Sequence, residues 1–233
     1  MGSIVIAFFL SPYLVRTLGD TGYGVWSIIA SLTAYMSLLD LGVTSAVAKY
    51  VSEYRAKKEN KSANEILASA VALLLCVAVA LVAVSPLIAS FISRTYDFDD
   101  SYTPIVSTLI VIAAIDMALY ILSGVLIGAV TGLQRYDVLN IIRILIALLK
   151  AILFYILLTK GYGLVGMASA ALVTNVLAAI IMYVFIRRKH KEMSFGFQHA
   201  KFATSKKIVA FSKFTFIKAF NNIKITLYHG NKD

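Results

Sequence analysis

Four charged side chains stand inside long apolar stretches of this chain, and they are the residues best placed to do chemistry. Asp116 is the only charge between Asp100 and Arg135, and Asp40, Arg143 and Lys150 also lie within apolar runs. A charge in hydrocarbon is costly, so such residues pair with one another or line a water-filled path. Two chemistries follow. Either the charges are ion pairs that hold helices together, or the cations meet an anionic substrate while the carboxylates carry a coupling proton or sodium ion.

The polar residues recur at helical spacing, which predicts one polar face on each of three helices. The first face consists of Trp26, Ala30, Thr33, Ser37, Asp40 and Thr44; the second of Asp116, Tyr120 and Ser123; the third of Asn140, Arg143, Ala147, Lys150 and Phe154. At a rise of about 1.5 Å per residue, Asp116 and Lys150 both fall near the membrane midplane. Asp40 and Arg143 fall together in the cytoplasmic half. We therefore expect one Asp116–Lys150 layer and one Asp40–Arg143 layer, with Lys150, Arg143 and Asn140 as candidate substrate-binding residues.

The elements that position these faces are transmembrane helices. A spanning helix needs about 20 apolar residues, and five runs satisfy this rule: 23–48, 66–93, 104–131, 138–159 and 163–186. The apolar run at 3–15 is too short to span and lacks the features of a signal peptide, so we interpret it as a first helix without its beginning. The prediction is an all-α integral membrane protein, with a six-helix transmembrane bundle over residues 1–186.

The composition supports a membrane protein and argues against other classes. Of the 233 residues, 60% are hydrophobic and 15% charged, where soluble domains carry roughly a quarter charged residues. The net charge of +10 does not predict nucleic-acid binding, because the basic residues lie between apolar segments rather than on one soluble face. The three histidines lack metal-ligand spacing, and the one acidic loop cluster has a simpler explanation as a solvated loop. We expect no metal, no cofactor and no enzymatic activity.

Lysine and arginine residues predict the orientation in a cell membrane, because cytoplasmic loops carry the excess. They are concentrated after the second predicted helix, around the loop before the fifth, and after the sixth. This pattern predicts that both termini are cytoplasmic. Residues 187–207 form a basic linker, and residues 208–233, with Lys213, Lys218 and Lys224 in an apolar background, form either an interfacial amphipathic helix or the damaged start of a seventh span.

Several short motifs occur in order along the chain. They are Pro12-Tyr13-Leu14-Val15-Arg16-Thr17-Leu18-Gly19, Tyr23-Gly24-Val25-Trp26, Leu39-Asp40-Leu41-Gly42, Ala48-Lys49-Tyr50-Val51, Gly132-Leu133-Gln134-Arg135-Tyr136-Asp137 and Phe211-Ser212. Together they resemble the polysaccharide transport proteins, the O-antigen and oligosaccharide flippases of the multidrug, oligosaccharidyl-lipid and polysaccharide exporter (MOP) superfamily. The resemblance covers nearly the whole chain.

The resemblance implies a carrier that moves an undecaprenyl-diphosphate-linked sugar unit from the cytoplasmic to the outer leaflet. Members have two six-helix lobes with a cationic cavity between them, so this chain corresponds to about half a transporter. We expect a fragment of a longer protein, or a half-length chain that pairs with a second lobe. The expected partners are lipid-linked oligosaccharide and membrane lipid. The alternatives are a cation-coupled multidrug exporter of the same superfamily and a non-functional truncated half.

Overall fold

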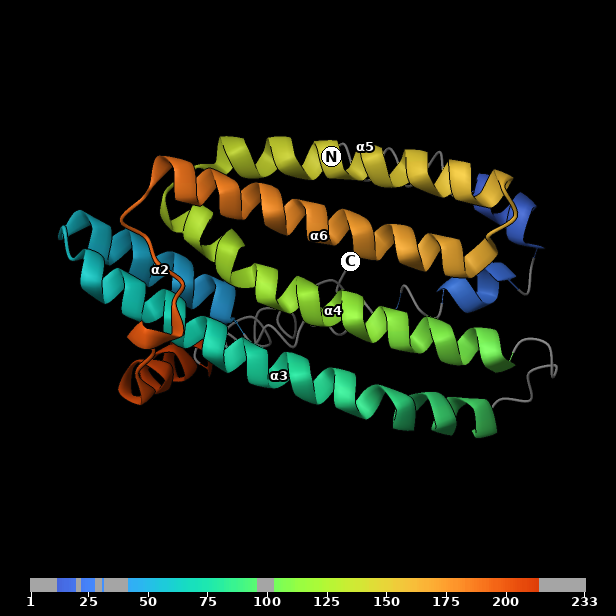
Figure 1. Ribbon diagram of the computed structural model, residues 1–233, viewed down its shortest axis with the longest axis horizontal. Helices are drawn as coiled ribbons and strands as arrows, with labels where there is room; N and C mark the ends of the chain where they lie inside the picture. The colour runs from blue at the N-terminus through green and yellow to red at the C-terminus, as the bar shows by residue number, and fades with distance from the viewer. Residues whose placement is uncertain (1–11, 20–21, 28–30, 32–41, 96–102, 214–233) are drawn as a thin grey trace, which may run out of the picture.

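Every regular element in the part of the chain that the computed structural model describes, residues 12–19, 22–27, 31, 42–95 and 103–213, is a helix (Figure 1). The long helices are α2 (Val43–Ala56), α3 (Asn60–Thr95), α4 (Thr103–Gly132), α5 (Tyr136–Thr159) and α6 (Gly163–Lys189). Residues 12–19 and 22–27 form short helical pieces. After α6 come a single 3-10 turn, η2 (Phe197–His199), and a helix over residues 202–213.

Four of these helices, α3 to α6, are long and apolar enough to cross a membrane. Helices are the expected solution in lipid, because each satisfies its own backbone hydrogen bonds. The prediction of an all-helical membrane protein is confirmed, and four of the five predicted spans coincide with α3 to α6. The count of six stays a prediction, since residues 1–11 and 32–41 lie outside the described residues.

The predicted continuous helix over 23–48 is interrupted at Gly42. Gly42 has a φ of 79° and forms the N-cap of α2, which then continues to Ala56 rather than ending at Ala48. Glycine adopts a left-handed conformation without the steric cost that a Cβ atom brings, so the residue type permits the break. Hydropathy could not predict this interruption, because apolar residues continue on both sides of it.

Helix α4 is the centre of the bundle and packs against α2, α3, α5 and α6. Gly124, Gly128 and Gly132 recur along it at a spacing of four. A Cβ atom on Gly128 would lie 2.7 Å from the Thr44 carbonyl oxygen, and one on Gly132 would lie 2.8 Å from the Ala48 carbonyl oxygen. Small residues at this spacing allow the backbones of membrane helices to approach closely. The α2–α4 contact therefore depends on Gly128 and Gly132.

Helix α3 continues through Pro86, which lies inside it. Proline lacks the N–H group that would bond to the carbonyl four residues earlier, which here belongs to Val82. The Ser85 hydroxyl donates to this Val82 oxygen at 2.8 Å. The carbonyl freed by the proline is therefore satisfied by the neighbouring side chain.

Candidate substrate-binding cavity

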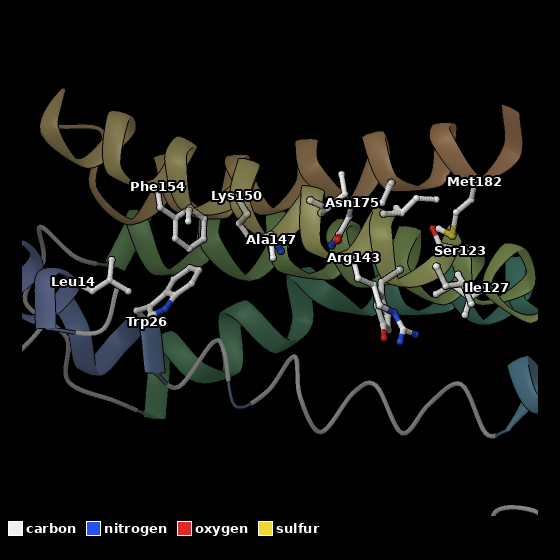
Figure 2. Close-up of a pocket in the computed structure, with 16 residues that line it drawn as sticks. Leu14, Trp26, Ser123, Ile127, Arg143, Ala147, Lys150, Phe154, Asn175 and Met182 are labelled. Atoms are coloured by element: carbon white, nitrogen blue, oxygen red, sulfur yellow. The ribbon is translucent and has the colours of Figure 1, made fainter. Parts of the chain in front are cut away.

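A cavity of about 670 Å³ lies between α4, α5, α6 and the helical pieces at 12–19 and 22–27. Figure 2 shows its labelled side chains in a row, from Leu14 and Trp26 at one end to Ser123, Ile127 and Met182 at the other. The volume falls within the range of small-molecule and cofactor sites. The full lining is Leu14, Trp26, Tyr120, Ser123, Ile127, Leu139, Ile142, Arg143, Ile146, Ala147, Lys150, Ala151, Phe154, Asn175, Ala178 and Met182.

Helix α5 provides the polar side of the cavity with the face that its spacing predicts. Arg143, Ala147, Lys150 and Phe154 all line the cavity, because steps of three or four residues return to the same side of a helix. Asn140, the first residue of that predicted face, is exposed and is not among the lining residues. Its role in binding stays a prediction.

The charges at the cavity are positive. Lys150 is half-buried and Arg143 is exposed along the same helix face. The described residues that line the cavity include these two cations and no carboxylate. Seven residues separate them along α5, which places them about 10 Å apart along the helix axis. The arrangement suits an elongated anion with more than one negative group.

Arg143 also lines a second, smaller cavity of about 260 Å³, which Thr44 and Ser45 border from the first turn of α2. Tyr120 belongs to both cavities as well. The helix N-terminus carries partial positive charge from its unpaired N–H groups. The positive potential around Arg143 therefore extends toward the break at Gly42.

Asp116 is buried beneath the cavity and is 9% exposed. The Asn175 amide of α6 donates a hydrogen bond to its Oδ1 at 2.7 Å, across the α4–α6 contact. Asn175 also lines the cavity. This hydrogen bond between helices connects the buried carboxylate to the cavity wall.

Asp116 and Lys150, which were expected to pair, do not form a direct ion pair. Asp116 and Lys150 interact electrostatically, but among the ion pairs of the described residues, defined by an N–O separation within 4.0 Å, this pair does not occur. The predicted Asp116–Lys150 layer therefore forms no direct ion pair in this structure. Asp40 lies outside the described residues, so the Asp40–Arg143 layer stays a prediction.

Aromatic residues form the far end of the cavity. The Trp26 and Phe154 rings meet edge to face, with centroids 5.5 Å apart, a favourable geometry for aromatic pairs. The Tyr13 ring, on the piece at 12–19, contacts the Tyr155 ring of α5, with centroids 5.3 Å apart. These contacts attach the helical pieces at 12–19 and 22–27 to α5. Among the described residues, no group of three or more metal-binding side chains occurs.

Sequence reasoning missed two parts of this site. The apolar wall from Ile127, Leu139 and Met182 carries no polar signal that would distinguish it from lipid-facing surface. The second part is the contact of α2 with α4, for which the glycine spacing on α4 is a signal in the sequence. It could have predicted that α2 packs on α4 and so brings Thr44 and Ser45 beside Arg143.

Comparison with known proteins supplies the family context. The model of the polysaccharide biosynthesis protein family matches residues 1–229. The uncharacterized membrane protein EpsK of Bacillus subtilis (strain 168) is 22% identical over 214 residues, which are 88% of this chain and 41% of that protein.

Two solved structures share the fold. A MOP superfamily transporter from Pyrococcus furiosus has a TM-score of 0.72 and 14% identity, covering 93% of this chain and 50% of that one. An inward-facing multidrug resistance MATE family transporter of the same superfamily has a TM-score of 0.64 and 16% identity, covering 85% of this chain and 47% of that one. The chain thus spans about half the length of the relatives it matches.

Proposed function

Because this chain belongs to the polysaccharide biosynthesis protein family, we propose that it forms one lobe of a membrane transporter for lipid-linked oligosaccharide. The substrate of this proposal is an undecaprenyl-diphosphate-linked sugar unit, moved from the cytoplasmic to the outer leaflet. The lobe comprises six helices over residues 1–186, with both termini on the cytoplasmic side of the cell membrane. A second lobe, from a longer product or from a partner chain, provides the opposite wall.

The observation that carries this proposal is the charge of the cavity. Its described lining includes Lys150 and Arg143 and no carboxylate. A diphosphate carries negative charge and accepts charge-assisted hydrogen bonds, which are about twice as strong as neutral ones. Arginine binds phosphate oxygens in a bidentate manner, while lysine acts as a point charge. The two residues therefore hold the diphosphate, and the isoprenoid tail extends toward lipid.

The buried carboxylate gives the lobe a means of coupling. Asp116 lies within α4, and among the described residues the Asn175 amide donates a hydrogen bond to its carboxylate. An intramembrane carboxylate of this kind accepts a proton or pairs with a cation as its surroundings change. In our proposal Asp116, together with Asp40, carries the coupling ion or pairs with the cations of α5 when no substrate is bound.

A multidrug exporter is the competing transporter, since one of the two structures with this fold is a multidrug resistance MATE family transporter. Arg143 and Lys150 would repel a cationic drug at close range. The charge of the cavity therefore favours an anionic substrate. Cation-dependent drug resistance on expression of the protein would support the exporter instead.

The proposal is tested by changing Lys150 to alanine in the gene of the source cell and measuring surface polysaccharide. Lys160→Ala is the matched control, because Lys160 is an exposed lysine at the C-cap of the same helix and does not line the cavity. We expect polysaccharide loss with accumulation of lipid-linked precursor for Lys150→Ala alone. Unchanged polymer in Lys150→Ala, with normal protein levels, would contradict the proposal.

A further inference from the structure

The helix over residues 202–213 has two different faces, and among the described residues only one of these faces packs on other helices. Ile208 and Ser212 are buried, at 0% and 3% exposed, and the Phe211 ring meets the Tyr50 ring of α2 with centroids 5.7 Å apart. Lys207 also contacts α2, because its Nζ donates a hydrogen bond to the Tyr54 hydroxyl at 2.6 Å. One side of the helix is thus fixed against α2.

The opposite face presents apolar and basic residues in a single stripe. Phe202, Lys206, Val209 and Lys213 follow one another at steps of four, three and four, and all are exposed. Phe202 is 78% exposed and Val209 is 47% exposed. The Lys206 ammonium lies 4.9 Å from the centroid of the Phe202 ring. Large exposed apolar residues beside lysines are the pattern of helices that lie in a membrane interface.

The start of this helix is fixed at a definite depth along α3. Ser69 accepts a hydrogen bond from the Lys201 backbone N–H at 3.0 Å and donates to the Lys201 carbonyl at 3.3 Å. Lys201 also pairs with Glu65 at 2.6 Å. Helix α3 has no charge between Glu65 and Arg94, so Ser69 lies about 6 Å inside its uncharged stretch. That depth corresponds to the boundary between headgroups and acyl chains.

The basic residues of this region match anionic lipid. Arg187, Arg188 and Lys189 occupy the last turn of α6, at the same end of the bundle as residues 202–213 (Figure 1). Together with Lys206 and Lys213 they place positive charge at the end of the described bundle that carries the apolar stripe. Anionic headgroups attract such residues by about 1 kcal/mol per lysine or arginine near the surface.

We propose that the Phe202–Lys206–Val209–Lys213 stripe is a docking surface for anionic phospholipid, with Phe202 and Val209 inserted among the acyl chains and the two lysines on the headgroups. The long lysine stems allow the ammonium groups to reach the headgroups while their methylenes remain in the apolar layer. The docked helix then holds the segment after α6 to both the membrane and α2.

The test uses fluorescence of a single tryptophan in the whole chain. Trp26 is the only tryptophan, so a Trp26→Phe, Phe202→Trp variant reports on the stripe alone. It is reconstituted into bilayers of zwitterionic phosphatidylcholine, with or without phosphatidylglycerol, that contain bromine-labelled acyl chains. Lys61→Trp in the same background is the control, because Lys61 is exposed near the start of α3, on the headgroup side of Glu65.

We expect the tryptophan at 202 to be quenched by the brominated chains, more strongly with phosphatidylglycerol, and the tryptophan at 61 to be quenched little. Changing Lys206 and Lys213 to glutamine lowers the docking equilibrium in the anionic bilayer by about fivefold per lysine. The proposal is overturned if the tryptophan at 202 is not quenched. A second copy or a second lobe that covers the stripe would give this result. Quenching that is indifferent to lipid charge and to both lysines also overturns it.

Discussion

The close approach of α2 and α4 predicts that Gly128→Ala destabilises the bundle although alanine is the better helix former. A Cβ atom at residue 128 would lie 2.7 Å from the Thr44 carbonyl oxygen and 2.9 Å from two side-chain atoms of Val47. Ordinary contacts begin at 3.4 Å, so the helices must separate by about 0.7 Å at this point. The carbonyl belongs to the backbone of α2 and cannot rotate away, so the strain spreads along the contact.

The size of the effect follows from two opposing terms. Overpacking of a well-packed core costs about 1–3 kcal/mol, and three contacts under 3.0 Å place this site in the upper part of that range. Replacing glycine by alanine within a helix returns about 1 kcal/mol. The net destabilisation is about 1–2 kcal/mol. For a chain of this length each kcal/mol corresponds to about 2–4 °C in Tm, so we expect a decrease of about 2–8 °C.

The assay is thermal unfolding of the purified protein in detergent, followed by size-exclusion chromatography of the fraction that stays folded. Gly24→Ala is the matched control, because a Cβ at this helical glycine meets no atom within 4 Å. The control keeps the gain in helix propensity without the clash, so its Tm stays unchanged or rises. A Tm for Gly128→Ala equal to or above that of the wild type would refute the packing argument.

Two further predictions concern polar contacts. Asn175→Leu leaves the Asp116 carboxylate without its 2.7 Å hydrogen bond and destabilises the protein by about 0.6–2 kcal/mol. The double variant with Asp116→Leu recovers part of this loss, because no carboxylate is then left without a donor. A double variant that loses as much stability as the two single variants together would argue against the contact. Burial and the Arg55 guanidinium, opposed by Glu192, hold the pKa of His190 below its usual 6.5. The neutral imidazole therefore stabilises the docking of the segment after α6 above pH 6.5, and this stabilisation is lost as the pH decreases through the lower pKa of the folded state. Hydrogen exchange of that segment, corrected for the intrinsic rate, rises below pH 6.5, and His190→Gln removes the pH dependence; an unchanged pH profile in that variant would exclude His190.

The sequence predicted what depends on local periodicity. The polar face of α5 was read correctly from Arg143 to Phe154, because a charge within an apolar run must face protein or water and the 3.6-residue period fixes its neighbours. The spans α3 to α6 were predicted from the length of their apolar runs, which is also a local property of the sequence. Asn140 belongs to the same periodic pattern, yet its place near the helix start leaves it exposed.

Features that depend on contacts between helices were less predictable. Asp116 was expected beside Lys150 from its depth alone, but depth does not specify how α4 and α5 rotate about their axes. The Asn175 amide took the position next to the carboxylate. The break at Gly42 was missed because hydropathy continues through it, although glycine is the residue type that permits its φ of 79°.

The central claim is that Lys150 and Arg143 bind a lipid diphosphate, and Trp26 in the same cavity allows a direct measurement. Trp26 is the only tryptophan of the chain, so its fluorescence is followed while the reconstituted protein is titrated with undecaprenyl diphosphate. The control titration uses the uncharged undecaprenol at equal concentration. We predict saturable binding of the diphosphate that weakens by about 10–100-fold in Lys150→Ala, the loss expected for one charge-assisted hydrogen bond, and no such change in Lys160→Ala. Equal binding of the two lipids, or equal affinity in Lys150→Ala and the wild type, would contradict the account.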